Sequence, residues 1–302
     1  SEPYGVVEDC DRYLRMDGET PADPDNPTAS QGQVLRLSGA LAGTPDGVTR
    51  VAYDGTPLPI GGDEWKVPTV TTRDIDRGDA PHFLLKEISE APASFRKTLR
   101  GRLVEEGGRL QVRLPAETLP PGLRTRIPSF RRIEVIGQGT AAVAGQAVAT
   151  ALAETLAGSG LVIGSITATE LSGFSLGDDM SDTLIVAISQ SGTTTDTNRT
   201  VDLVRSRGAA VVAIVNRRGS DLVDKSDGVL YTSDGRDVEM SVASTKAFYA
   251  QIAAGFLLAE ALADLIPGVT LPEADRQRVL AGLAALPEAM IATLALQPRI
   301  GE

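Results

Sequence analysis

The alternation of apolar strands and amphipathic helices after residue 130 constrains the fold of this chain more than any other feature. Thr183 to Ile188 and Ala209 to Val215 are continuous apolar runs, which are typical of strands buried on both faces of a parallel sheet. Between them, Thr194 to Arg207 has helical periodicity and is followed by Gly208. This order of elements predicts an α/β fold with right-handed crossovers.

The rest of the chain extends this pattern. Further strands are expected at 132–136, 161–167 and 228–231, and further helices at 141–156, 244–265 and 274–296. We therefore expect a parallel sheet flanked by helices, in a flavodoxin-like three-layer arrangement. Upstream, 82–103 has helical periodicity, but Pro92 predicts two helices or a kink. The segment 109–128 is expected to be a loop.

Residues 1–75 have a different character. Short strands are expected at 13–18, 33–37 and 48–53, and Asp-Gly turn signals end the first and follow the last of them. This region is too short and too poor in core residues to be an independent domain. We expect it to be the end of a β-rich domain.

The charge and the residue counts exclude some classes of function. A net charge of -11 argues against broad nucleic-acid binding, because such proteins present a basic face. An anionic small ligand is not excluded, because backbone N–H groups and hydroxyls at a helix N-terminus can hold a phosphate. Cys10 and His82 are the only residues of their types, so we expect no disulfide framework, no metal and no cofactor.

The most apolar stretch late in the chain is interpreted as a buried helix. The stretch 248–266 contains Gln251, Glu260 and Asp264, which a membrane span would not favour. The first residues show no basic segment followed by an apolar one, so we expect no signal peptide. With the low cysteine count, this favours a cytoplasmic location.

The polar turn after the strand at 183–188 is the most informative segment. Four hydroxyl or amide side chains gather there: Ser189, Gln190, Ser191 and Thr194. In an open α/β sheet, ligands bind outside the carboxyl ends of the strands, and the next helix offers free N–H groups. The segment is interpreted as a phosphate site that needs no arginine. The alternative is that its serines and threonines only cap the helix.

A second loop, 137–142, follows the first strand of the predicted sheet. Its sequence matches G-x-G-x-x-A, the dinucleotide fingerprint, which keeps a nicotinamide dehydrogenase as an alternative function. The acidic residue expected near Ile166-Thr167 is missing, so the match is weak. We interpret the loop as a second wall of a small-ligand site, with Thr140 contributing. The alternative is a glycine turn that only allows close helix–strand packing.

A third segment, 239–248, follows the last predicted strand and should lie at the same sheet edge as the Ser-Gln-Ser turn. Ser244 is expected to cap the long helix that begins there. By base rate, Lys246 is a surface lysine.

Together these motifs resemble the first SIS (sugar isomerase) domain of the glutamine–fructose-6-phosphate aminotransferase family. The shared motifs are S-Q-S-G-x-T-x-D-T at 189–197 and V-A-S-T-K-A-F at 242–248. Upstream, K-E-I-x-E-x-P at 86–92 and T-L-x-G-R at 98–102 resemble the segment that precedes that domain. The similarity covers roughly 80–302 and, more faintly, 1–75.

The resemblance implies a sugar-phosphate site. Its residues would be Thr140, Ser189, Gln190, Ser191, Thr194, Val242 and Ser244. Glu239 and Lys246 are weaker candidates for assisting proton transfer. The family usually has Gly-Thr-Ser where this chain has Gly139-Thr140-Ala141, so one hydroxyl is missing. A lost hydrogen bond to a charged group costs about 1.5–3 kcal/mol, which leaves the exact phosphosugar open.

The resemblance also implies a division of the chain into four parts. Residues 1–75 would be the end of a glutaminase-like domain, 76–128 a linker with helices, and 129–268 the SIS domain. A helix at 269–302 would lead toward a second SIS domain, which holds the family's catalytic acid–base residues and which we expect this chain to lack.

The function expected from the resemblance is the binding of fructose 6-phosphate or glucosamine 6-phosphate. This would serve a glutamine-dependent amidotransferase/isomerase of amino-sugar biosynthesis, with this chain incomplete for catalysis. The alternative is a non-catalytic SIS module that senses a phosphosugar. Family members form dimers through these domains, so a homodimer is expected. The apolar helices at 141–156 and 248–266 are the candidates for its interface.

Overall fold

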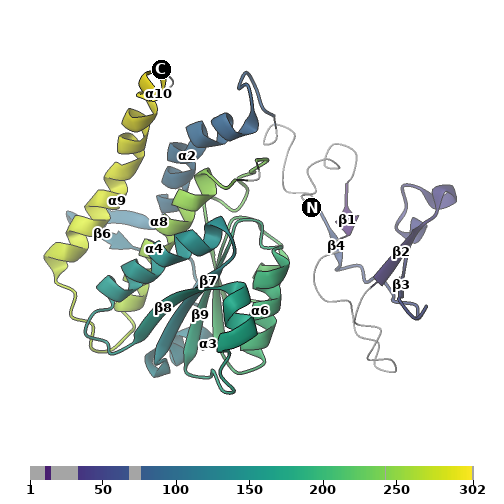
Figure 1. Cartoon of the computed structure of the whole chain (residues 1–302), viewed down its shortest axis with the longest axis horizontal. Coiled ribbons are helices and arrows are strands. Elements are labelled where there is room, and N and C mark those ends of the chain that lie inside the picture. Colours follow the sequence, from purple (N-terminus) through teal and green to yellow (C-terminus); the bar gives the residue numbers. More distant parts are fainter. Residues whose placement is uncertain (1–10, 15–32, 68–75, 242, 301–302) are drawn as a thin grey trace. The chain divides into compact units, whose positions relative to one another are not determined.

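The computed structural model describes residues 11–14, 33–67, 76–241 and 243–300. The chain divides into two compact units, Ser1–Thr72 and Arg73–Glu302, which we treat separately. The second unit carries the parallel sheet and its helices (Figure 1).

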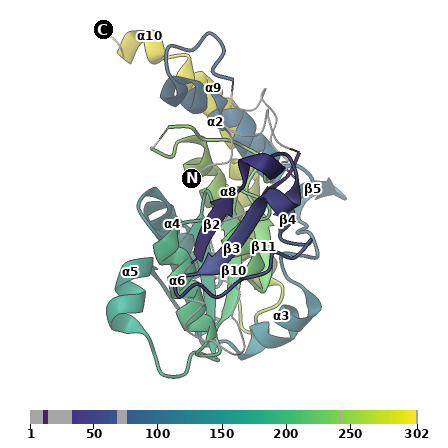
Figure 2. The same cartoon turned by 90° about the vertical axis from the view of Figure 1, so that its right-hand side faces the viewer.

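The first unit contains short antiparallel strand pairs in its described part (Figure 2). The pairs are β2 (Gln33–Leu37) with β3 (Val48–Ala52), and β1 (Tyr13–Leu14) with β4 (Trp65–Lys66). Two 3-10 turns, η3 (Gly39–Leu41) and η4 (Pro45–Gly47), connect β2 to β3. The expected β-rich character is confirmed. Of the strand expected at 13–18, the part 15–18 lies outside the described residues.

The second unit is built on a five-stranded parallel sheet. Its strands, in spatial order, are β11 (Gly228–Tyr231), β10 (Ala210–Val215), β9 (Thr183–Ser189), β7 (Arg132–Gly137) and β8 (Val162–Thr167). Every residue of β9 and β10 is buried, as their continuous apolar sequences require. The predicted parallel α/β sheet is confirmed.

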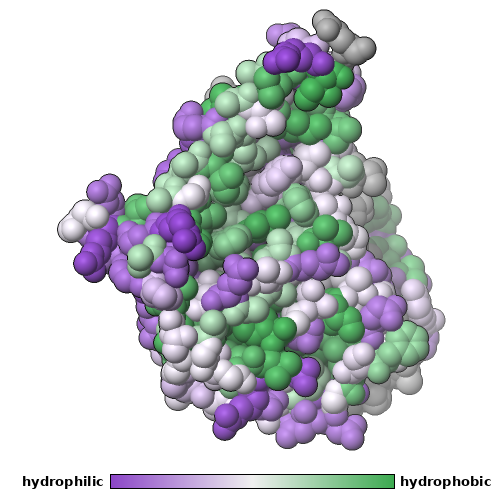
Figure 3. All heavy atoms as spheres, turned by 60° about the vertical axis from the view of Figure 1, so that its left-hand side comes forward, coloured by the Kyte–Doolittle hydropathy of each residue, from purple (hydrophilic) through white to green (hydrophobic). Residues whose placement is uncertain are grey.

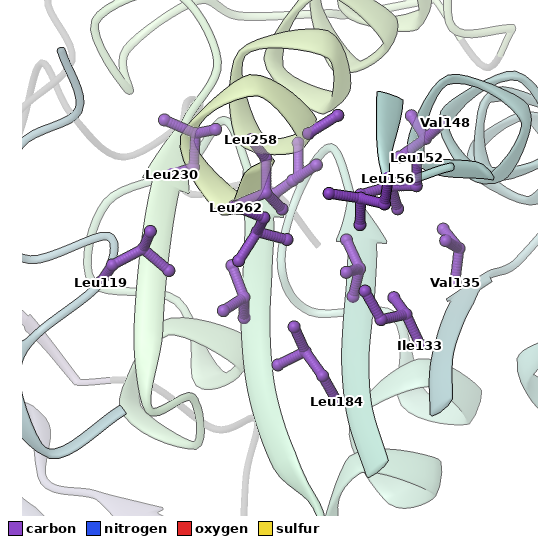
Figure 4. Packing of buried hydrophobic residues seen from close by; sticks show 14 of the residues in the cluster. Leu119, Ile133, Val135, Val148, Leu152, Leu156, Leu184, Leu230, Leu258 and Leu262 are labelled. Carbon is purple, nitrogen blue, oxygen red and sulfur yellow. The ribbon is translucent and has the colours of Figure 1, made fainter. Parts of the chain in front are cut away.

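Helices cover both faces of this sheet, which confirms the three-layer arrangement (Figure 1). The longer ones are α4 (Thr140–Thr155), α6 (Thr195–Arg205), α8 (Lys246–Ala263) and α9 (Glu273–Leu294). Figure 4 shows Val148 and Leu152 of α4 and Leu258 of α8 packed over one face of the sheet. Full burial of one such side chain contributes about 1.5–3 kcal/mol. The other face carries α6 with α5 (Ala168–Glu170), the π-turn η6 (Leu171–Ser175) and α7 (Asp221–Asp224).

The segment with Pro92 forms one helix, α2 (Phe83–Leu99), and not the two helices or the kink that Pro92 predicts. Phe95 of α2 is buried in an apolar cluster with Leu257 of α8 and Leu280 of α9. Buried residues lie on both sides of Pro92, Glu87 and Ala91 before it and Phe95 and Leu99 after it, and this packing outweighs the missing N–H of the proline. A short helix, α10 (Gln297–Ile300), follows α9.

The segment expected to be a loop, 109–128, contains regular structure. A hairpin joins β5 (Leu103–Glu106) to β6 (Arg109–Val112), and α3 (Pro121–Arg126) and the turn η5 (Ile127–Ser129) follow. Gly107 and Gly108, with φ of 60° and 75°, form the two-residue turn between the strands. A Gly-Gly pair with positive φ favours a tight hairpin, so this signal was present in the sequence.

The strand order places a crevice at one edge of the sheet. The chain passes from β7 to β8 on one side and continues from β9 to β10 and β11 on the other. The direction of winding therefore reverses between β7 and β9, and ligands of open α/β sheets bind at such a point. In the described part of the chain, no helix has the length and apolarity needed to cross a membrane.

Candidate functional site

A cavity of about 300 Å³ lies at the carboxyl ends of β7 and β9. It is lined by Gln138, Gly139, Thr140, Ala141, Ile188, Ser189, Gln190, Ser191, Thr194, Glu239, Ser241, Ser244 and Gln251. Three segments far apart in sequence thus meet at the sheet edge, as the sequence predicted. Glu239 is the only acidic or basic side chain among these lining residues.

The turn from β9 into α6 exposes one hydroxyl proton to the cavity. Gly192 has φ +67° and donates its N–H to Ser189 Oγ at 3.0 Å. Ser191 Oγ accepts hydrogen bonds from the Thr193 N–H at 3.2 Å and from Thr193 Oγ1 at 3.0 Å. Because these bonds occupy the lone pairs of Ser191 Oγ, its own proton is available to an acceptor.

The start of α6 adds backbone donors to the same turn. Thr194 is the N-cap residue, but its side chain makes no capping hydrogen bond, and its Oγ1 lies 3.3 Å from Ser189 Oγ. The first-turn N–H groups have no partner within the helix and carry the positive end of its dipole. The alternative in which these hydroxyls only cap the helix is therefore wrong for Thr194.

The loop after β7 brings a second helix start to the cavity. Gly139, with φ +58°, is the N-cap of α4, which begins at Thr140. A Cβ on Gly137 would lie 2.8 Å from the backbone carbon of Ala141, so this glycine is needed for close packing. Thr140 and Ala141 both line the cavity, and the alanine methyl offers no hydrogen bond there.

The segment before α8 is held by a carboxylate. Ser244 does not cap the helix as expected, because α8 begins at Lys246 and Thr245 is its N-cap. Glu239 accepts the N–H groups of Thr245 at 2.9 Å and Ala247 at 3.1 Å, and Ser244 Oγ donates to its Oε2 at 2.9 Å. The anion that satisfies this helix N-terminus is thus part of the protein.

Lys246 does not line the cavity. It is only 4% exposed, not the surface lysine expected, and its Nζ lies 2.5 Å from Glu90 Oε2 on α2. Burial alone would raise the pKa of Glu90, but hydrogen bonds from Lys246 and Lys86 outweigh it and hold that pKa below its usual value. His82 is also outside the lining, and its Nδ1 caps α2 by accepting from Leu85 N–H at 3.2 Å.

The cavity thus brings together most of the residues singled out in the sequence. Those among its lining are Thr140, Ser189, Gln190, Ser191, Thr194, Ser244 and the weaker candidate Glu239. Val242 lies outside the described residues. Sequence reasoning missed Gln138, Ser241 and Gln251. A signal existed for Gln251, which is a polar residue in a mostly apolar stretch of sequence and is 1% exposed in the structure.

Sequence comparison identifies the class of domain. The family model of the SIS domain matches residues 127–261, which contain the whole sheet and the cavity loops up to the start of α8. The second unit therefore contains an SIS domain.

The proteins that this chain resembles are more specific. It is 35% identical over 269 residues to glutamine–fructose-6-phosphate aminotransferase [isomerizing] of Symbiobacterium thermophilum, covering 86% of this chain and 40% of that protein. It is 38% identical over 225 residues to the protein of that name from Corynebacterium diphtheriae, covering 72% and 33%. The resemblance seen in the motifs is confirmed, and the chain spans less than half the length of these relatives.

Solved structures support the fold. The C-terminal domain of glucosamine-fructose-6-phosphate aminotransferase from Francisella tularensis superposes with a TM-score of 0.62 at 24% identity, covering 74% of this chain and 59% of that one. A putative phosphosugar isomerase from Clostridium difficile gives a TM-score of 0.56 at 19% identity, covering 72% and 55%. At these identities the likeness concerns the fold alone.

Proposed function

We propose that the cavity binds a phosphosugar such as fructose 6-phosphate or glucosamine 6-phosphate. The observation that carries the proposal is the turn 189–194, where Ser191, whose Oγ already accepts two hydrogen bonds, and Thr194, the N-cap of α6, line the same cavity. Such donors can hold a phosphate without a cationic side chain. Thr140 and Ser244 complete the site, and Val242 remains a proposed member of it.

We infer that this binding serves a glutamine-dependent amidotransferase/isomerase of amino-sugar biosynthesis, because the relatives described above carry the name of such an enzyme. Isomerisation needs an acid–base pair near the reacting carbons. The one acidic residue among the lining, Glu239, has both oxygens engaged by Ser244, Thr245 and Ala247. We therefore propose that this chain binds the sugar and that the proton-transfer groups come from elsewhere.

A phosphosugar-sensing module is the second candidate. It is favoured by Ala141, which gives the wall that Thr140 also lines one hydroxyl fewer, and by the hydrogen bonds that already engage Glu239. The two candidates share the site and differ in turnover, so glucosamine 6-phosphate formation by the whole protein distinguishes them. A nicotinamide dehydrogenase is not proposed, because the comparisons identify an SIS domain around the glycine loop.

The arrangement of the chain is also a proposal. Residues 1–75 would end a glutaminase-like domain, 76–128 would link it to the SIS domain at 129–268, and 269–302 would lead toward a second SIS domain.

We also propose that the chain forms a homodimer and that it is located in the cytoplasm. Twelve residues of α8 are buried within the chain, so exposed apolar side chains such as Val143 of α4 and Ile291 of α9 are better interface candidates. Figure 3 shows apolar side chains on the face that carries these helices. Sedimentation of the purified chain tests the dimer.

Replacing Ser191 by alanine is expected to weaken phosphosugar binding 10-fold to 100-fold, since a hydrogen bond to a charged group contributes about 1.5–3 kcal/mol. Thermal unfolding with and without fructose 6-phosphate measures this. At a concentration 100 times its dissociation constant, the ligand should stabilise the wild-type chain by about 2.7 kcal/mol, and the variant by about half of that or less.

Ser206→Ala is the matched control, because Ser206 lies at the other end of α6 and its Oγ donates to the Leu203 carbonyl at 2.8 Å. It should keep the full ligand-induced shift. An unchanged shift in Ser191→Ala, or none in the wild-type chain with any hexose phosphate, would refute the proposed site.

A further inference from the structure

The two ends of the cavity leave opposite hydrogen-bonding roles to a ligand. At the 189–194 end, Ser191 Oγ already accepts two hydrogen bonds, so its proton is available. At the 239–244 end, the hydroxyl protons are already used. Ser244 Oγ donates to Glu239 Oε2 at 2.9 Å, and Ser241 Oγ donates to Glu87 Oε2. A hydroxyl has one proton, so both serines present only lone pairs to the cavity.

Glu239 strengthens this difference, because it adds a carboxylate, which can only accept. We call Glu239, Ser241 and Ser244 the acceptor wall. Gln251 also lines the cavity, but its amide offers donors as well as an acceptor.

Glu87 fixes the direction of the Ser241 hydroxyl although it does not line the cavity. It lies on α2 and is 1% exposed. Its carboxylate accepts from the N–H of Met240, from the N–H of Ser241 at 3.2 Å and from Ser241 Oγ. The carbonyl of Ala243, 3.1 Å from Ser241 Oγ, is a second acceptor for the same proton. Either partner leaves the serine lone pairs to the ligand.

We propose that Glu87 is a positioning residue that, through Ser241, makes this end of the cavity accept hydrogen bonds and so sets the orientation of the bound sugar phosphate. The phosphate lies at the 189–194 end, and O–H or N–H donors of the sugar lie against the acceptor wall. The negative charges of Glu87 and Glu239 repel a phosphate from the acceptor wall. This inference rests on the proposed function.

The test compares two ligands by calorimetric titration. In this proposal, inorganic phosphate contacts only the 189–194 end of the cavity, whereas fructose 6-phosphate contacts that end and the acceptor wall. In Glu87→Gln the new amide can donate to Ser241 Oγ, so it occupies a lone pair that the wild-type serine presents to the ligand. We expect fructose 6-phosphate to bind about tenfold more weakly and inorganic phosphate to change by less than about twofold. Ser241→Ala should also weaken the binding of fructose 6-phosphate without weakening that of inorganic phosphate. This variant replaces Glu87→Gln in the test if Glu87→Gln does not fold.

Two further variants make the test specific. Glu105→Gln, on the exposed side of β5, removes the same charge away from the cavity and should change neither affinity. The double variant Glu87→Gln/Ser241→Ala should lose little more than the larger single loss, because both changes remove one interaction.

The possible failures are distinguishable. An equal loss for both ligands in Glu87→Gln would show that Glu87 only supports the fold, and unchanged affinity would show that it does not act through Ser241. Either result overturns the inference and leaves phosphosugar binding intact. A wild-type chain that does not bind fructose 6-phosphate would overturn the proposed function itself.

Discussion

Replacing Gly192 by alanine is expected to destabilise the second unit by roughly 2–5 kcal/mol and to abolish phosphosugar binding. The residue has φ +67°, a conformation that costs an L-residue about 1–2 kcal/mol. An added Cβ would also lie 2.0 Å from Ser220 Oγ and 2.6 Å from Ser220 Cβ. Ser220 is only 1% exposed, so overpacking should add about 1–3 kcal/mol. Denaturant unfolding measures the total as a shift of the midpoint.

Gly219→Ala separates the two causes. Gly219 has φ +62°, and a Cβ built there meets no atom within 4 Å, so only the conformational cost of about 1–2 kcal/mol is expected. The variant Gly192→Ala/Ser220→Gly should recover the steric part. Equal losses for Gly192→Ala and Gly219→Ala would contradict the close approach of the turn to Ser220.

Glu260→Gln is expected to stabilise the chain by about 1–3 kcal/mol at pH 8 and by little at pH 5. Glu260 on α8 is 3% exposed, and burial raises its pKa to about 7, although Arg276 opposes this. Arg276 Nε lies 3.0 Å from Oε2, yet neither carboxylate oxygen has a partner in hydrogen-bond geometry among the described residues. The burial of the charge is therefore only partly compensated.

The sign of the pH effect follows from the raised pKa. Between about 4.5, the value of the unfolded chain, and about 7, the folded state keeps a proton that the unfolded state releases. Stability therefore falls as the pH rises through this window, by about 3 kcal/mol for the full shift, and the loss is complete above pH 7. Carboxyls with lowered pKa, such as Glu90, act in the opposite direction at lower pH.

Unfolding at pH 5 and pH 8 measures this difference. Asp264→Asn is the control, because Asp264 contacts the same Arg276 at 3.0 Å but its side chain is 64% exposed. The charge of Asp264 raises the Glu260 pKa less than burial does, so this variant should alter the difference between the two pH values far less than Glu260→Gln. A Glu260→Gln variant less stable than the wild-type chain at pH 8 would show that the pair with Arg276 outweighs the cost of burial.

The local pattern of the sequence predicted the parallel sheet and the 189–194 end of the cavity. The buried strands β9 and β10 are continuous apolar runs, and the Ser-Gln-Ser turn follows β9 directly. Such features depend on neighbours in the sequence. The α2 helix was harder to predict, because its continuity through Pro92 depends on packing against α8 and α9.

The acceptor wall could not be predicted from local signals. Glu87 and Ser241 are 154 positions apart in the chain, and no local pattern shows that a carboxylate on α2 receives the serine proton. The same holds for Lys246, which pairs with Glu90 across 156 positions and so turns away from the cavity. Ser244 was the expected cap of α8, but Glu239 takes this role because its carboxylate accepts hydrogen bonds from two N–H groups at the start of the helix.

A crystal structure of the chain with fructose 6-phosphate tests the central claim most directly. The account predicts phosphate oxygens within hydrogen-bond distance of Ser191 Oγ and of the first-turn N–H groups of α6, with sugar hydroxyls against Ser241 and Ser244. A sugar phosphate bound with its phosphate at the acceptor wall, or bound outside this cavity, would contradict it.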